Sequence, residues 1–245
     1  MNITKMATMK VFMPLVLVLV ITASPAVGMK EMAEEGHAMS MHHQHQILNH
    51  ALAMALQGSN LVMIGQMKMV PGVDDLAVRH GTMMMKEARA MWNETMSGSM
   101  MTKMHGAGTT PADNPVMEYT HKLAEAQVKV MDLLEKHAAT QGHTMTVHHQ
   151  HLLLNHALEM AIDASDMSMT GAMGMAPGID EESVGHGKKM MGHARSLWND
   201  VMSGDDMKKA HGEGMTPEKD AGMAFTHELA EAQLKVMDLL ENMPK

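Results

Sequence analysis

Histidine and methionine occur in this chain at spacings that could place both side chains on one metal ion. The 245 residues include 36 methionines and 18 histidines. In a helix, residues four positions apart lie on one face with their Cβ atoms about 5–6 Å apart. Four pairs in the first half of the chain have this spacing: His50–Met54, His80–Met84, Met101–His105 and Met117–His121. Soft thioether sulfur selects Cu(I), and imidazole also binds copper, so the pairs favour a copper site with Cu(I) as the preferred state.

The same pairs occur a second time. Shifting the sequence by 106 residues aligns 42–135 with 148–241 without a gap, and 53 of the 94 positions are identical. A period this long with two copies indicates duplication of a domain rather than a solenoid. The matching pairs are His156–Met160, His186–Met190, Met207–His211 and Met223–His227. The sequence therefore predicts two related metal-binding units and several ions per chain.

Two other groups of metal-ligating residues are kept in both copies. The HHxH clusters are His42, His43 and His45, and His148, His149 and His151. The loop methionines are Met67 and Met69, and Met173 and Met175. The three rings of one cluster cannot share a helix face. Each cluster is therefore either an exposed Cu(II) or Zn(II) site, a capture point that passes ions to the His–Met pairs, or a solvated helix start. The loop methionines lie beside a Pro-Gly turn, where a soft-metal role explains them better than packing does.

The segments that carry these residues have helical patterns and no convincing strand alternation. An apolar face predicts a first helix that ends near Gly65, and further helices are expected over 74–98, over 99–105 and from about residue 110. The expected N-caps are Ser40 and Thr110, with Thr146 and Thr216 at the matching positions. The predicted fold class is all-α, with two tandem homologous helical bundles of three to four helices each, produced by an internal duplication.

The N-terminal 28 residues have the pattern of a secretory signal peptide. Two lysines precede an apolar run of about a dozen residues and a small-residue exit, and the run is shorter than the roughly 20 residues of a membrane span. No later segment is expected to span a membrane, so the mature chain is expected in the periplasm or otherwise exported. The expected divisions are a signal peptide 1–28, a lead-in segment 29–41, a helical metal-binding repeat 42–137, a linker 138–147 and a second helical metal-binding repeat 148–245.

Composition argues against several function classes. The chain has no cysteine, so disulfides, thiolate metal sites and cysteine nucleophiles are absent. Its net charge of −9 argues against nucleic-acid binding, which requires a basic surface. No HExxH, CxxCH or glycine-rich phosphate motif is present. No catalytic residue is therefore predicted, and the chain is not expected to be an enzyme.

Methionine also has roles without metal. It is a flexible core filler, and about half of the methionines kept in both copies, including Met131 and Met237, are assigned to packing. A second function is scavenging of oxidants, with methionines consumed as sulfoxides, which predicts exposed methionines. A third is a methionine-rich surface that binds a partner protein, which predicts a contiguous exposed apolar face.

An exported, cysteine-free helical chain with HHQH, MGM and repeated His-x-x-x-Met pairs resembles the methionine- and histidine-rich periplasmic copper-binding and copper-resistance proteins of bacteria. The resemblance covers both copies and lies in composition and pairing. It implies binding of Cu(I) or Ag(I) for sequestration, storage or delivery, with a copper exporter or a cuproprotein acceptor as candidate partner. A monomer or a small homo-oligomer is expected. The duplicated, well-patterned body departs from the small disordered members and favours several ions per chain.

Overall fold

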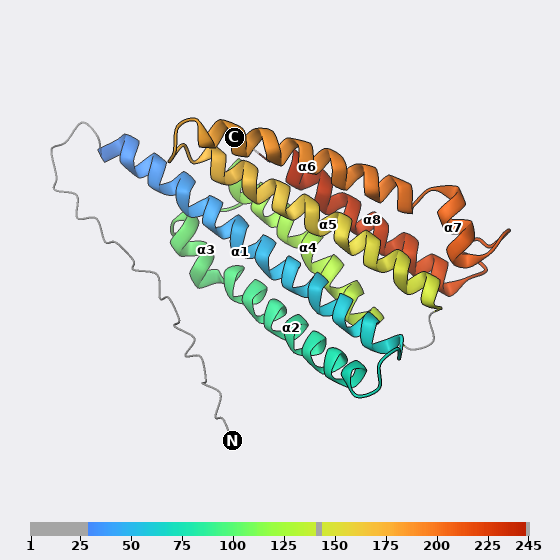
Figure 1. Ribbon diagram of the computed structural model, residues 1–245. Helices are drawn as coiled ribbons and strands as arrows, with labels where there is room; N and C mark the ends of the chain where they lie inside the picture. The colour runs from blue at the N-terminus through green and yellow to red at the C-terminus, as the bar shows by residue number, and fades with distance from the viewer. Residues whose placement is uncertain (1–28, 141–143, 244–245) are drawn as a thin grey trace, which may run out of the picture.

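The computed structural model describes residues 29–140 and 144–243, and the predicted signal peptide lies outside them (Figure 1). Within these residues the secondary structure is entirely helical, which confirms the all-α class. The eight helices described are α1 (Met29–Gln66), α2 (Val73–Thr95), α3 (Gly98–His105), α4 (Pro115–Ala138), α5 (Met145–Ala172), α6 (Ile179–Val201), α7 (Gly204–His211) and α8 (Ala221–Glu241). The short helix expected over 99–105 is thus confirmed as α3.

Four long helices form the centre of the molecule. Helices α1, α4, α8 and α5 contact one another in a closed ring, while α2 lies along α1 and α6 lies along α5 on the outside (Figure 1). Within the first copy α1 and α4 run parallel, because His45 contacts Thr120 and, further along both helices, Asn49 contacts Gln127. The second copy repeats this arrangement with α5 and α8.

The two copies pack against each other in antiparallel orientation. Asn49 of α1 bonds to Asp166 of α5, and Asn155 of α5 bonds back to Asn60 of α1. One hydrophobic cluster runs through both copies; its members include Leu52, Leu134, Leu158 and Met237. The prediction of two tandem bundles is therefore not confirmed, because helices from both copies share a core. Each pair of long helices has an apolar face that the other copy covers.

Close approach of α1 and α2 depends on small residues. A Cβ atom on Gly58 would lie 2.7 Å from the carbonyl oxygen of Gly81, which is closer than real side chains approach. Ala164 replaces Gly58 in the second copy, whereas the glycine on the facing helix is kept as Gly187. The tight hairpin brings the end of α2 beside the start of the buried part of α1, where the candidate site lies.

The predicted caps of the first helix in each copy are wrong. Helix α1 begins at Met29, so Ser40 lies inside it. Helix α5 is capped by Thr144, two residues before Thr146, and the Thr144 side chain accepts a hydrogen bond from the backbone N–H of Val147.

The predicted caps of the last helices are also wrong. Thr110 and Thr216 begin turns that precede α4 and α8. The caps are Asn114 and Asp220, whose side-chain oxygens each accept two hydrogen bonds from backbone N–H groups of the first turn. Asparagine and aspartate rank above threonine as N-caps. Here they directly precede Pro115 and Ala221, the first residues of α4 and α8.

One described segment is long and apolar enough to cross a bilayer. Met41–Gln66 makes up most of α1; its most apolar window of 18 residues has a mean hydropathy of 1.3, and 56% of that window is buried inside the bundle. We expected no segment after the predicted signal peptide to be able to span a membrane. Met41–Gln66 is an exception by length and composition alone.

Candidate metal site

Only one of the four His–Met pairs in each copy is buried at both residues, and all eight pairs lie in the described part of the chain. Met101 and His105 are 7% and 3% exposed, and Met207 and His211 are 4% and 9% exposed. In the other pairs the histidine faces solvent: these are His50, His80, His121, His156, His186 and His227. Their partners Met54, Met84, Met160 and Met190 are half-buried, and Met117 and Met223 are buried. The shared spacing therefore describes one inner pair and three outer pairs per copy.

The inner pair is held by a short helix with well-defined ends. Helix α3 begins after Ser97, whose side chain accepts from the N–H of Met100, and it stops at Gly106, where φ is 90°. A positive φ is the conformation that glycine adopts without strain. Helix α7 repeats both devices with Ser203 and Gly212. Because Met101 and His105 lie one helical turn apart, both side chains point from α3 towards α1.

A glutamine connects the two members of the inner pair. Gln44 is fully buried; its Nε2 lies 3.1 Å from Met101 Sδ, and its Oε1 lies 3.0 Å from His105 Nε2. The second copy has the same contacts at 2.9 and 3.0 Å, made by Gln150 to Met207 and His211. Sequence reasoning missed both glutamines, although their retention inside the HHQH motif was an available signal.

A second buried imidazole lies beside each inner pair. His45 Nε2 is 2.7 Å from Thr120 Oγ1, and that hydroxyl donates its hydrogen to the carbonyl of Val116 at 2.9 Å. The threonine must therefore accept from the imidazole, which places the proton on Nε2 of His45. Burial, with a smaller contribution from the nearby His42 and His105, lowers the pKa of His45 to about 4. The ring is thus neutral at neutral pH, the form that binds metal ions.

The second copy has the same threonine contact and one more. His151 Nε2 lies 2.8 Å from Thr226 Oγ1, and the same hydroxyl lies 3.4 Å from His211 Nε2. Thr226 also donates to the carbonyl of Gly222 at 3.0 Å. One hydroxyl therefore links the two buried imidazoles of this copy.

An additional histidine contacts the buried histidines of the second copy. We call the end of the bundle that holds the inner pair of each copy the first-copy end and the second-copy end. His137, in the last turn of α4, has its Nε2 3.0 Å from Nδ1 of His151. Its ring centroid lies 4.7 Å from that of His151, 5.7 Å from that of His148 and 5.1 Å from that of Phe225. Sequence reasoning missed His137, because it lies two residues beyond the aligned region 42–135 and has no histidine counterpart in the second copy.

The first-copy end has different neighbours. Tyr119 stands at the position of Phe225; its ring lies 5.4 Å from that of His45, and its hydroxyl donates to the carbonyl of Leu239. The residue that matches His137 is Met243, which packs against the shared core.

The HHxH clusters differ from the expected exposed sites. His45, His148 and His151 are buried, whereas His43 and His149 face solvent and His42 is half-buried. The expectation that the three rings of a cluster do not share one face is confirmed. The expectation of an exposed site is wrong for the three buried rings, because α4 and α8 cover that side of the helices.

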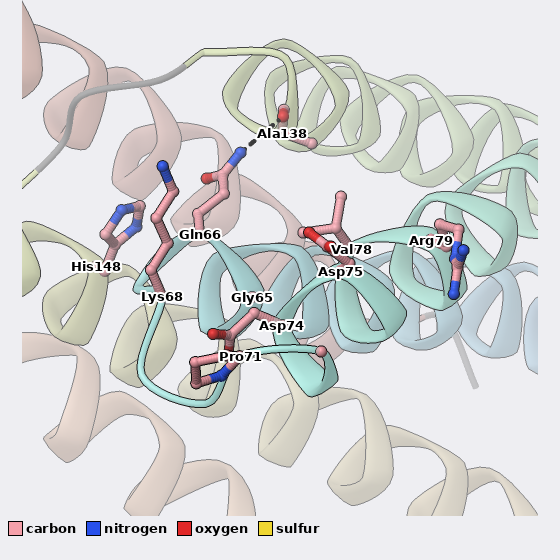
Figure 2. Close-up of a pocket in the computed structure, with 11 residues that line it drawn as sticks. Gly65, Gln66, Lys68, Pro71, Asp74, Asp75, Val78, Arg79, Ala138 and His148 are labelled. Carbon is pink, nitrogen blue, oxygen red and sulfur yellow. Dashed lines mark hydrogen bonds between the residues drawn. The ribbon is translucent and has the colours of Figure 1, made fainter.

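The loop methionines lie at the tips of the two hairpins. Met69 and Met175 are exposed, and Met67 and Met173 are half-buried. Beside the first tip lies a cavity of about 1170 Å³. Figure 2 shows Lys68 and His148 on one side of it and Asp75 and Arg79 on the other, so its lining is mixed in charge. No thioether lines this cavity, and the structure does not bring the loop methionines to the inner pair.

Met190 lies at a smaller hollow of about 450 Å³ between α5 and α6. Asp163, Asp166 and Met167 share its lining. Burial raises the pKa of Asp166 to about 6, although the hydrogen bond from Asn49, 2.8 Å long, opposes the shift. A carboxyl group in this environment is partly protonated near pH 6.

Within residues 29–140 and 144–243, no group of three or more histidine or carboxylate side chains is arranged to hold a metal ion. The arrangement that the chain offers is mixed: one thioether and one imidazole of the inner pair, with a second imidazole next to them. No protein family, no curated protein and no solved structure matches this chain.

Proposed function

We propose that this protein is an exported copper-binding protein that holds Cu(I) through thioether and imidazole ligands for sequestration, storage or delivery. One observation carries the proposal: a buried Met–His pair lies beside a second buried histidine, and this arrangement occurs in both copies. Buried imidazoles need hydrogen-bond partners, whereas leucine would build this part of the core without them. The presence of these buried polar groups in both copies is understandable if they have a binding role.

The ligand chemistry supports a soft monovalent ion. Thioether sulfur and neutral imidazole carry no charge, and soft sulfur prefers Cu(I) or Ag(I) to Mg(II) or Ca(II). A pKa of about 4 for His45 means that protons do not compete for its lone pair near neutral pH. The net charge of −9 raises the local concentration of cations around the chain.

The outer pairs and the exposed histidines have a weaker role in this proposal. Each outer histidine faces water while its methionine is at least half-buried, so an ion there competes with solvent. His43 and His149 offer exposed imidazoles, which suit capture of Cu(II). We infer weak capture at the surface and tight binding at the two inner pairs.

Anaerobic titration of residues 29–245 with Cu(I) against a competing chromophoric chelator tests this function. The test variant is Met101→Leu with Met207→Leu, which removes both inner thioethers at nearly constant volume. The matched control is Met85→Leu with Met191→Leu, which replaces two core methionines of similar burial on α2 and α6. We expect tight ions in the native chain and the control, and their loss in the test variant.

Two other results would redirect the assignment. Equal binding by the test variant and the control would remove the inner pairs from the site. No competition by the native chain would reject copper binding, and methionine oxidation or a protein partner would then be examined. Export is tested separately by the mass of the chain in cell fractions: a form that begins near residue 29 outside the cytoplasm is expected, and an uncut cytoplasmic chain contradicts export.

A further inference from the structure

Gln44 and Gln150 have contacts that copper binding alone does not explain. Each is buried, and each places one amide group against both ligating atoms of an inner pair. An amide nitrogen only donates hydrogen bonds and an amide oxygen only accepts them. The thioether sulfur of Met101 is therefore an acceptor of an N–H group, and Nε2 of His105 donates to the amide oxygen. In this state the sulfur is engaged and Nε2 carries a proton, so Nε2 can bind an ion only after that proton moves to Nδ1.

The same amide nitrogen also donates to a backbone carbonyl. Gln44 Nε2 donates to the carbonyl oxygen of Thr95, 3.5 Å away at the end of α2, and Gln150 Nε2 donates to that of Val201 at 3.3 Å. When an ion takes the sulfur, the amide keeps this carbonyl bond and does not have to enter water. A buried donor that would otherwise lose its partner is costly, so this second acceptor makes release of the sulfur feasible.

We propose that Gln44 and Gln150 are latches that hold the inner pairs closed in the metal-free protein and, when a soft cation binds, release the pairs and keep only their hydrogen bonds to the α2 and α6 carbonyls. The inference rests on the proposed copper function. The latch also selects among ions. Displacing the amide costs hydrogen bonds, and only an ion with high affinity for thioether sulfur recovers that cost. Hard cations such as Mg(II) and Ca(II) leave the latch closed.

Two further glutamines provide a matched control. Gln127 and Gln233 are fully buried, and they donate to Asn49 and Asn155 rather than to an inner pair. The test variant is Gln44→Leu with Gln150→Leu, and the control is Gln127→Leu with Gln233→Leu. Both variants lose buried hydrogen bonds and some stability, but only the first opens the inner pairs. Ag(I), which mimics Cu(I) and does not change oxidation state, is the probe.

We expect the latch variant to bind Ag(I) about tenfold more tightly than the native chain, since about one net hydrogen bond no longer has to be broken. The control should bind as the native chain does. Unchanged or weaker binding by the latch variant overturns the latch, and weaker binding would make the glutamines positioning residues instead. A native chain that binds no Ag(I) removes the copper proposal and the latch with it.

A second measurement uses the native chain and does not depend on a variant that folds. In ¹H–¹⁵N spectra the side-chain NH₂ signals of Gln44 and Gln150 should move as Ag(I) is added, because one N–H group of each amide loses its sulfur acceptor while the bond to the carbonyl stays. The signals of Gln127 and Gln233 should stay in place. Bound Ag(I) without movement of the first two signals contradicts the latch and leaves the metal site itself intact.

Discussion

The two ends of the bundle each contain an inner pair and its buried glutamine, but the residues around them differ. At the first-copy end, the cap of α4 is the neutral Asn114. At the second-copy end, the cap of α8 is Asp220, whose Oδ2 lies 3.7 Å from Nδ1 of His211, and His137 adds an imidazole. Both copies have the buried Gln–Met–His arrangement, while the residues around it differ in charge. The comparison distinguishes the residues that both inner pairs share from the neighbouring residues that change the charge around them.

The contacts between the copies show the same divergence. Asn155 bonds to Asn60 on one side of the interface, and Asn49 bonds to Asp166 on the other, at 2.8 Å in both cases. One contact joins two amides, and the other joins an amide to a carboxyl group with a raised pKa. Only the second contact depends on pH.

The largest expected effect is the loss of one inner site at a time. His105→Leu should remove the tight ion of the first copy, and His211→Leu that of the second, each with an affinity loss at that end of more than about 100-fold. Each single variant should keep half of the tight Cu(I) capacity measured by chelator competition. If one variant removes all tight binding, the two ends share a single ion and the comparison between them fails.

His137→Leu should destabilise the second-copy end. The substitution removes the imidazole that donates to His151 Nδ1, and an unsatisfied buried acceptor costs about 1–3 kcal/mol. Urea denaturation at pH 7 measures the free energy of unfolding. The matching substitution at the other end, Met243→Leu, conserves volume and should cost less than about 1.5 kcal/mol. Equal losses for the two variants would show that His137 acts only through packing.

Asp166→Asn makes the two interface contacts alike. The folded-state pKa of about 6 lies above the ordinary value of 3.8, so the native state holds the proton more tightly than the unfolded chain does. This group therefore favours folding at low pH, and its contribution falls as pH rises from about 4 to 6. The variant should be about 1–2 kcal/mol more stable than the native chain at pH 7 and should lose this pH dependence.

Thermal or urea unfolding between pH 4 and pH 8 checks the Asp166 prediction, with Asp200→Asn, at an exposed position of α6, as control. The control should keep the native pH profile. A native and an Asp166→Asn profile that run parallel would remove Asp166 as the pH-dependent contact.

The smallest effect is expected from exchanging the caps. Asn and Asp are equivalent as N-caps, so Asp220→Asn should change stability by less than about 0.5 kcal/mol at pH 7. It removes a negative charge near His211, so Ag(I) should bind about threefold more weakly at the second-copy end. The reciprocal Asn114→Asp should strengthen the first-copy end by a similar factor. Titration calorimetry of both variants measures the shifts, and identical affinities throughout would show that the cap charge is screened.

Much of the local structure is predictable because it depends on near neighbours. The spacing of apolar residues indicated the first helix to within two residues of its end at Gln66, and the short helix α3 nearly in full. The caps were less predictable. Thr110 and Asn114 are both good N-caps in one polar loop, and the difference between them is small compared with the packing that sets where α4 begins.

The sequence by itself determined the all-α class, the internal repeat and the spacing of the His–Met pairs, because helix periodicity depends on neighbouring residues and a repeat can be read from the order of residues. Only the tertiary structure decided which histidines are buried. His43 and His45 are two residues apart, yet His43 faces solvent and His45 meets Thr120, 75 residues further along the chain. The roles of Gln44 and His137 depend on equally distant partners. Burial is set by the helices that cover each face, and here those helices come from both copies.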